Sequence, residues 1–279
     1  MSGINLYQID LRQVATLEGL TSGNIYVEAS GRRRPDKFRV QDYFLPHHWR
    51  LVKGYLVGPK ANLSVANLTN ADLKNTNLED ADLSNATLDG VKSGGIRGGK
   101  PKSLPNGWFT SQGFLIGPGA NLDGSRLNRV EFSEKNITGI DFSGSDFYKV
   151  RSGDVTIARG AEAQLPDEWH FVGGFLLGPT ADLSNQILSD LVLSKDIDLS
   201  KANLNGLKSN NISGNPSLPD GWKLLKQEGK NYGFLLGPGA NLEDANFFRT
   251  NLSDVDLGSL DLRTSVLDRV RSKRTTGSP

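Results

Sequence analysis

Large apolar side chains recur every five residues over most of the chain. From Ala61 the sequence reads ANLSV ANLTN ADLKN TNLED ADLSN ATLDG, with a leucine at the centre of each unit. The central residues of this first run are Leu63, Leu68, Leu73, Leu78, Leu83 and Leu88. A period of five fits neither the 3.6-residue turn of a helix nor the two-residue alternation of a flat strand. The pattern is an internal repeat, which has to be recognised before any secondary structure is assigned.

Each five-residue unit predicts a short strand followed by a corner. The residue two before the centre is usually small and apolar, as Ala61 is before Leu63, so three residues alternate in, out and in. The remaining two residues are mostly polar or glycine, which turn the chain. Repetition of this unit predicts a coil whose stacked turns bury the central side chains. Three later runs continue the period, centred on Leu122, Leu127, Phe132, Ile137, Phe142 and Phe147, on Leu183, Leu188, Leu193, Leu199 and Leu204, and on Leu242, Phe247, Leu252, Leu257, Leu262 and Leu267.

A second repeat of about sixty residues places a tryptophan-containing stretch before each run. Leu-Pro is followed by a tryptophan and then by Gly, an aromatic residue, two aliphatic residues, Gly and Pro. We call these stretches Trp segments 1 to 4, at residues 45–59, 104–118, 165–179 and 218–238, and they hold all four tryptophans of the protein: Trp49, Trp108, Trp169 and Trp222.

Each Trp segment is expected to lay its indole on an apolar surface and to contain a short buried strand ended by a turn. The alternative is a platform of exposed aromatic rings for sugars or a partner. The strict repetition of tryptophan with Pro and Leu favours packing.

The two repeats divide the chain into modules. Each module runs from its Leu-Pro to a closing Val/Leu-Lys/Arg-Ser, which gives modules 1 to 4 at Leu45–Ser93, Leu104–Ser152, Leu165–Ser209 and Leu218–Ser272. Residues 1–44 lack the pattern and are predicted to form a docking or capping segment, because the open end of a coil of strands needs a cover. Residues 45–272 form the repeat domain, and residues 273–279 are predicted to be a flexible tail.

The A(N/D)LXX units resemble the pentapeptide-repeat family. This resemblance implies an all-β fold, a right-handed quadrilateral β-helix with four units per coil, and a cramped site two residues before each centre. Lys135 and Gln186 depart from the small residues that such a site prefers. Because an unpaired buried polar group is costly, we expect the coil to bulge at both residues or their side chains to reach outward past a local distortion.

Composition narrows the classes of function. The 279 residues include 32 Lys and Arg and 31 Asp and Glu, a net charge of +1, so a polyelectrolyte partner for the whole protein is not indicated. The absence of cysteine excludes disulfides, thiolate metal sites and a cysteine nucleophile. No apolar run is long enough to span a membrane, and the first residues do not have the pattern of a secretory signal.

Candidate chemistry is sparse. A basic run in the N-terminal segment contains Arg32, Arg33, Arg34, Lys37 and Arg39, and it is typical either of a solvated loop or of an arm that docks on another subunit or on nucleic acid. Without interleaved aromatic residues the run is weak support for nucleic acid. The histidines, His47, His48 and His170, lie in loops of the Trp segments, and carboxylates such as Asp72 occupy outward repeat positions. We therefore predict no catalytic residue, no metal site and no cofactor.

The pattern favours a non-enzymatic structural or interaction protein. We expect a bacteriophage virion component: a tail fibre, a tail accessory protein or a capsid decoration. Its rigid β-helix would dock through residues 1–44 onto other structural proteins of the assembly. The chain is also expected to form a homo-oligomer. One alternative is a protein of the bacterial cytoplasm that imitates DNA on a topoisomerase, which requires a strongly negative surface. Another is a β-helical adhesin that binds or degrades sugars, which requires a convergent acidic or histidine site.

Overall fold

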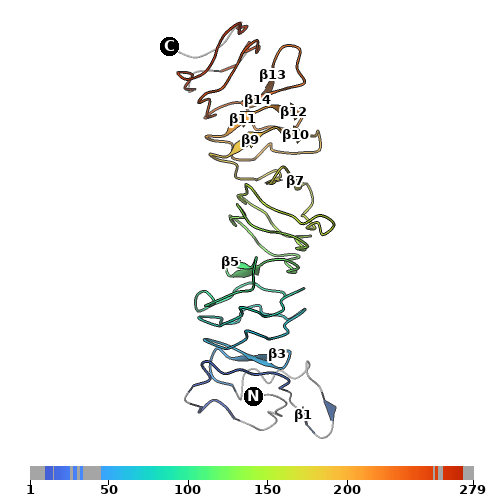
Figure 1. The fold of residues 1–279 in the computed structure, drawn as a ribbon, viewed down its shortest axis with the longest axis vertical. Coiled ribbons are helices and arrows are strands. Elements are labelled where there is room, and N and C mark those ends of the chain that lie inside the picture. Colours follow the sequence, from blue (N-terminus) through green and yellow to red (C-terminus); the bar gives the residue numbers. More distant parts are fainter. Residues whose placement is uncertain are drawn as a thin grey trace. The chain divides into compact units, whose positions relative to one another are not determined.

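The computed structural model describes residues 10–14, 16–25, 28–29, 32–33, 45–253, 255–256 and 260–272. These residues form short strands, isolated β-bridges and corners, with no helix, so the fold is all-β as predicted (Figure 1). No helix able to cross a membrane occurs in this part of the chain. The chain divides into two compact units, Met1–Ser125 with Asn136–Gly144 and Ile157–Gln164, and Arg126–Lys135 with Ser145–Thr156 and Leu165–Pro279.

Parallel bridges show how the coil is built in each unit. In module 1, Asn62 pairs with Asp82 and Asn67 with Thr87, and in module 2 Arg126 pairs with Asp146. Each pair is separated by four five-residue units, so one coil has four sides. Hydrogen bonds follow the same register, as when the Leu63 N–H donates to the Asp82 carbonyl at 2.8 Å. The chain is therefore a quadrilateral β-helix, in which each coil satisfies the backbone of the next.

The corners are β-turns that start at the central residue of each unit. The Ala71 N–H donates to the Leu68 carbonyl at 2.8 Å, which encloses Thr69 and Asn70. Asn70 has a φ of 56°, a left-handed conformation that Asn and Gly adopt more readily than other residues. Val65 stands at the same point of the first corner without a positive φ, as expected for a β-branched residue.

The central residues fill the core. The six leucines of module 1 are at most 2% exposed, and they form one cluster with the buried alanines two positions before them. In the second unit, Leu183, Leu188 and Leu193 belong to a cluster of the same kind. The small residues are required because the inward side chains of neighbouring coil sides meet there. Burial ends with the last coil, where Leu262 is half-buried and Leu267 is 45% exposed.

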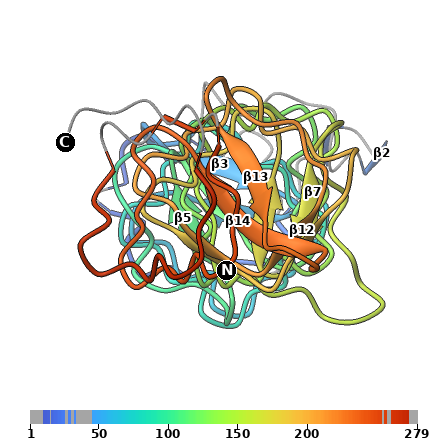
Figure 2. The same cartoon turned by 90° about the horizontal axis from the view of Figure 1, so that it is seen from above.

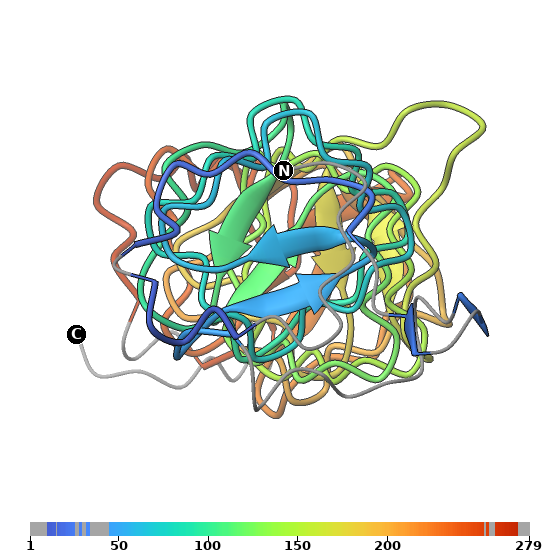
Figure 3. The ribbon, with the colours of Figure 1, turned by 90° about the horizontal axis from the view of Figure 1, so that it is seen from below.

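Each Trp segment forms a β-hairpin, where the sequence predicted a single strand. The paired strands are β3 (Arg50–Val52) and β4 (Tyr55–Val57), β5 (Phe109–Ser111) and β6 (Phe114–Ile116), β7 (His170–Val172) and β8 (Phe175–Leu177), and β13 (Lys223–Lys226) and β14 (Tyr232–Leu236). The last pair is the longest because module 4 carries six extra residues (Figure 2). Leu56 and Val57 of β4 are fully buried in the cluster of module 1, and β3 and β4 cross the middle of the coil's outline in Figure 3.

The tryptophan explains the glycine of the Gly-Pro motif. A Cβ added to Gly58, Gly117, Gly178 or Gly237 would lie 2.3–2.4 Å from the Cδ2 atom of the tryptophan in the same Trp segment. The indole therefore lies directly on the glycine backbone, and no other residue fits. Trp49 is buried, and Trp108, Trp169 and Trp222 are half-buried against the core clusters. This arrangement favours packing over an exposed aromatic platform.

The remaining strands are short. They are β1 (Glu28–Ala29), β2 (Arg32–Arg33), β9 (Ile187–Ser189), β10 (Val192–Leu193), β11 (Lys208–Asn210) and β12 (Ile212–Gly214). Strands β1 and β2 pair antiparallel, whereas β9 with β11 and β10 with β12 pair parallel between successive coils. Strand β12 also pairs antiparallel with β14, which joins the coil of module 3 to the hairpin of module 4.

The two predicted distortions of the coil are absent. The Lys135 N–H donates to the Phe132 carbonyl at 2.9 Å and the Gln186 N–H to the Leu183 carbonyl at 3.2 Å, which are the ordinary corner bonds. Both residues are half-buried, so their side chains reach solvent in part without a change in the corner. The expectation of a bulge is wrong because long side chains can leave the cramped site along its edge.

The contact between glycine and tryptophan predicts a strong effect of one methyl group. Gly117→Ala places its Cβ about 2.3 Å from Trp108 Cδ2, so we expect a loss of about 1–3 kcal/mol in the free energy of unfolding, measured by chemical denaturation. Gly124→Asn is the control, since this corner glycine has a φ of 66° and open space around it. Equal stability of the Gly117→Ala variant and the wild type would contradict the packing of the indole on its glycine.

Candidate functional site

The basic segment lies mostly beyond the part of the chain that the structure describes. Arg34, Lys37 and Arg39 fall outside the described residues. Arg32 and Arg33 form β2, which pairs with β1 at Ala29 and Glu28. The role of these five residues in docking therefore stays a prediction.

The outward carboxylates and amides have a structural task that was not anticipated from the sequence. Where the residue before a centre is Asn or Asp, its side chain accepts a hydrogen bond from the backbone N–H two residues later, as Asp72 Oδ1 does from Lys74 at 3.0 Å. Asn67 accepts in the same way from Thr69 at 3.1 Å, and Asp146 from Tyr148 at 3.1 Å. These bonds cap the corners. The frequent Asn and Asp before the central residue was the signal that could have revealed them.

Charges of opposite sign alternate between coils. Arg151 lies between Glu131 and Asp182, because its backbone bridges to both residues. Its Nε is 3.3 Å from Glu131 Oε2, and its Nη1 is 3.7 Å from Asp182 Oδ2. In the first unit, Asp72 bridges to Lys92 in the next coil. Acidic residues on these faces are thus followed by basic or neutral ones, which prevents a continuous acidic stripe along them.

Hydrogen bonds lower the pKa of two corner aspartates. For Asp82, the Ser103 hydroxyl is the main cause of the lowered pKa, followed by the backbone and side chain of Ser84. For Asp182, partial burial raises the pKa, but Ser184, Arg151 and Asn203 together outweigh burial, and the net pKa is lowered. Both shifts follow from capping and cross-coil pairing, so they mark structural carboxylates and not a catalytic acid.

His47 and His48 lie in a turn of Trp segment 1, as predicted, whereas His170 lies in a strand and not in the predicted loop. His47 and His48 are exposed and their rings contact each other at a centroid distance of 3.8 Å, while His170 is half-buried in β7. Among the described residues, no group of three or more His, Asp or Glu side chains could hold a metal ion.

In two of the four modules, the residue before the tryptophan has a side chain and a strained, left-handed backbone conformation. The Trp49 N–H donates to the Pro46 carbonyl at 3.0 Å, and His48, the third residue of this turn, has a φ of 75°. The equivalent residues have φ values of 80° at Gly107, 65° at Glu168 and 80° at Gly221. A side chain in this conformation costs roughly 1–2 kcal/mol relative to glycine. His48 and Glu168 are therefore not the residues that stability alone would select.

A serine at the end of modules 1, 2 and 3 clasps the hairpin of the module that follows. Ser93 Oγ donates to the Leu115 carbonyl at 3.1 Å and accepts from the Leu115 N–H at 3.0 Å, in the middle of β6. Ser152 makes the same two bonds to Leu176, and Ser209 makes them to Leu235. All three serines are buried. The closing Ser of the sequence motif is therefore the residue that joins one module to the next.

The N-terminal segment contains the same clasp. The Leu56 N–H donates to Ser22 Oγ at 2.8 Å, and the Ile25 N–H donates to the Gly54 carbonyl at 3.0 Å. Leu17 and Ile25 are buried with the leucines of module 1. Residues 16–23 thus repeat the arrangement of residues 87–94 at the end of module 1. This similarity was not recognised from the sequence, although TLEGLTSG and TLDGVKSG show it.

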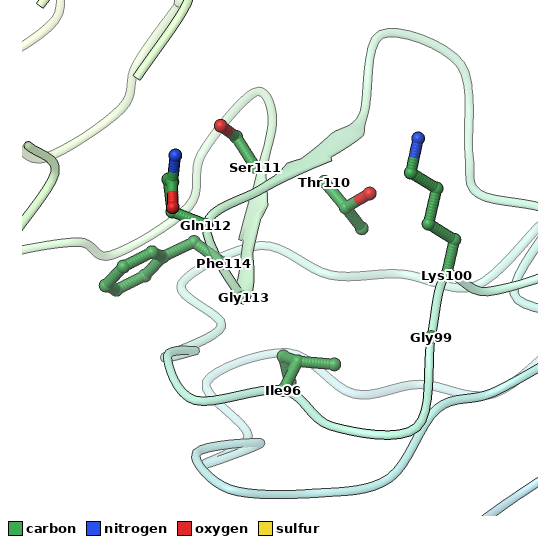
Figure 4. Close-up of a pocket in the computed structure, with 8 residues that line it drawn as sticks. All are labelled: Ile96, Gly99, Lys100, Thr110, Ser111, Gln112, Gly113 and Phe114. Atoms are coloured by element: carbon green, nitrogen blue, oxygen red, sulfur yellow. The ribbon is translucent and has the colours of Figure 1, made fainter. Parts of the chain in front are cut away.

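Two cavities lie beside the hairpins of the first unit. One has a volume of about 230 Å³ and is lined by Lys100, Thr110, Ser111 and Gln112 over Ile96 and Phe114 (Figure 4). The other has a volume of about 470 Å³ and is lined by residues of Trp segment 1, the N-terminal segment and the coil of module 1. Neither cavity brings together the paired carboxylates that hydrolysis of a sugar requires.

Comparisons with known proteins identify the repeat. The family model for pentapeptide repeats matches residues 60–92 and 238–268, in eight copies. Two solved structures are similar at low identity. HetL, a pentapeptide repeat protein involved in heterocyst differentiation regulation from the cyanobacterium Nostoc sp. strain PCC 7120, is 20% identical, over 76% of this chain and 90% of that one, with a TM-score of 0.20. QnrB1, a plasmid-mediated fluoroquinolone resistance protein, is 17% identical, over 74% and 85%, with a TM-score of 0.17. No curated protein matches the sequence.

The clasp predicts that two buried serines stabilise the hairpins. Ser93→Ala leaves the Leu115 N–H and carbonyl without their side-chain partner, so we expect a loss of about 1–3 kcal/mol and faster hydrogen exchange at Leu115. Ser22→Ala should increase exchange at Leu56 in the same way. Exposed Ser194→Ala is the control and should change stability by less than about 0.5 kcal/mol. Unchanged exchange in both variants would show that the clasp contributes nothing.

The lowered pKa of Asp182 predicts a dependence of stability on acid. A carboxylate whose pKa is lower in the folded state stabilises the fold above its ordinary pKa of 3.8, and this contribution disappears as the pH falls through the folded pKa. The free energy of unfolding should therefore fall more steeply below about pH 4 in the wild type than in Asp182→Asn. Asp198→Asn, which retains a corner acceptor toward Ser200, is the control for the corner bond alone. Identical acid profiles of Asp182→Asn and the wild type would contradict this role.

Proposed function

Because this chain is a pentapeptide-repeat protein, we propose that it is a non-enzymatic scaffold that docks in a larger assembly. The observation that carries the proposal is the structural use of its polar side chains. The outward Asn and Asp residues cap corners, as Asp72 does for Lys74, and the buried serines hold hairpins, as Ser93 does for Leu115. A surface whose polar groups support the backbone suits a rigid spacer better than a catalyst.

The assembly that we propose is a bacteriophage virion, with the chain as a tail fibre, tail accessory protein or capsid decoration. The modular coil, the clasps between modules and the distinct basic segment at residues 31–39 support this role, because a spacer needs a stiff body and an adhesive end. The partner is then another structural protein of the virion, contacted through Arg32, Arg33, Arg34, Lys37 and Arg39. A homo-oligomer is compatible with such a role.

The alternatives have less support. A DNA mimic acting on a bacterial topoisomerase requires a continuous acidic surface, whereas Arg126 bridges to Asp146 and Arg151 lies between two acids. A β-helical adhesin that degrades sugars requires converging carboxylates, and the corner aspartates accept backbone hydrogen bonds on the outside of the coil.

Mass spectrometry of purified virions tests the proposal. We expect the chain in a constant ratio to the major structural proteins of the phage that encodes it. The full-length variant Arg32→Gln/Arg33→Gln/Arg34→Gln should enter virions about tenfold less, because the charged docking contact is lost. Arg126→Gln/Arg129→Gln is the matched control, since both arginines are exposed on the coil. Absence of the chain from virions would overturn the virion role, and equal loss in both variants would overturn docking through the basic segment.

A further inference from the structure

The larger of the two cavities described above concentrates positive charge. Its volume is about 470 Å³, within the range of small-molecule sites. Three arginines from separate parts of the chain line it: Arg12 from the N-terminal segment, Arg50 from β3 and Arg97 from the coil. His47 and His48 complete one wall, and the described residues that line the cavity include no carboxylate. Folding thus gathers cations that lie far apart in the sequence.

Packing does not require these residues. Where module 1 has His47 and His48 before its tryptophan and Arg50 after it, module 2 has Asn106, Gly107 and Phe109. The equivalent residues in module 3 are Asp167, Glu168 and His170, and those in module 4 are Asp220, Gly221 and Lys223. All four Trp segments nevertheless form the same turn and hairpin. The turn and hairpin of Trp segment 1 therefore do not require His47, His48 and Arg50.

The backbone adds an independent sign of selection at this place. His48 has a φ of 75°, whereas the glycines of modules 2 and 4 satisfy the same turn without strain. A strained side chain that lines a cavity is typical of a site where function outweighs stability. Glu168 shows the same strain in module 3, but His48 is the one that stands beside a cavity with three arginines.

The contacts of Arg50 and Arg97 leave guanidinium N–H groups available to a ligand. Arg50 is half-buried, and its Nη1 donates to the Lys74 carbonyl at 2.5 Å, which orients the guanidinium and leaves its other N–H groups without a partner among the described residues. Arg12 is paired with Asp10, so it contributes less charge. Arg97 is exposed, and its side chain has no hydrogen-bond partner in the described part of the chain. Asn77, buried at 8% exposure, offers an amide at the same wall.

We propose that this cavity binds a small molecule that carries a phosphate or diphosphate group. A guanidinium presents a planar fork of N–H donors that matches two oxygens of one phosphate, so Arg50 and Arg97 are the two principal contacts. His47 and His48 border the same phosphate from the turn before Trp49. The inference goes beyond the proposed scaffold role and does not depend on it, since a rigid coil can carry a ligand site in any assembly.

Titration calorimetry with pyrophosphate at constant ionic strength tests this site on the full chain. We expect saturable binding at one site per chain, weakened about tenfold by Arg97→Gln because a charged hydrogen bond is lost. Arg126→Gln is the matched control, because Arg126 occupies the same outward repeat position in module 2 and lines neither cavity of the first unit. Binding that is lost equally in both variants, or that never saturates, would overturn the proposal.

A second variant separates loss of the site from loss of the fold. His47→Asn/His48→Gly installs the residues of module 2. Glycine adopts the positive φ of residue 48 without strain, so the variant should unfold at the same or a higher temperature than the wild type. We expect it to bind pyrophosphate severalfold more weakly. Wild-type affinity in this variant together with wild-type affinity in Arg97→Gln would overturn the site. Affinity for single-stranded oligonucleotides that rises with their length and exceeds that for pyrophosphate would assign the cavity to nucleic acid and reject the small-molecule ligand.

Discussion

Parallel hydrogen bonding between successive coils is the constraint on which the rest of the structure depends. The central leucines are buried in one cluster that spans successive coils: Asn67 pairs with Thr87 in the next coil, and Leu68 and Leu88 belong to the same cluster. Stability is then a sum of contacts between neighbouring coils. This explains why the central leucines of module 1 are at most 2% exposed, whereas Leu267, which has no coil beyond it among the described residues, is 45% exposed.

The hairpins of the Trp segments pair the backbone of the stretches that interrupt the coil. Excursions of the chain between runs would leave backbone groups without partners, and the hairpins provide internal pairing for them. The indole on its glycine fixes the base of each hairpin, and the preceding serine fixes its second strand at Leu56, Leu115, Leu176 or Leu235. Trp segment and coil therefore form one structural unit, repeated with little variation where packing is concerned.

The residue types of the four Trp segments differ mainly at positions that do not pack in the core. The two residues before each tryptophan are basic, neutral or acidic without any change in the turn, and only Trp segment 1 combines histidines with arginines from other parts of the chain. The outward positions of the coil, by contrast, carry the corner caps and the cross-coil pairs such as Arg151 with Glu131. A scaffold built in this way can change its binding properties at its Trp segments and ends while its body stays constant.

The sequence by itself determined the coil. The period of five, the small residue before each centre and the polar corners are local requirements of the backbone, so the residues from Leu63 to Leu88 were sufficient for the fold and for most of the core. The four Trp segments could be located, and the packing of their tryptophans anticipated, for the same reason. The corner caps could have been inferred from the Asn and Asp before each centre, but an outward carboxylate looks the same in the sequence whether it binds water or the backbone.

Only the tertiary structure decided what lies together across long separations. The sequence set residues 1–44 apart, yet Ser22 and Ile25 complete the hairpin of module 1, because a clasp depends on a partner about thirty residues away and not on its neighbours. The first strand of each hairpin was missed because three residues such as Arg50–Val52 carry no periodic signal. The cavity of Arg12, Arg50 and Arg97 was equally invisible, since the repulsion between distant cations arises only when folding brings them to one wall.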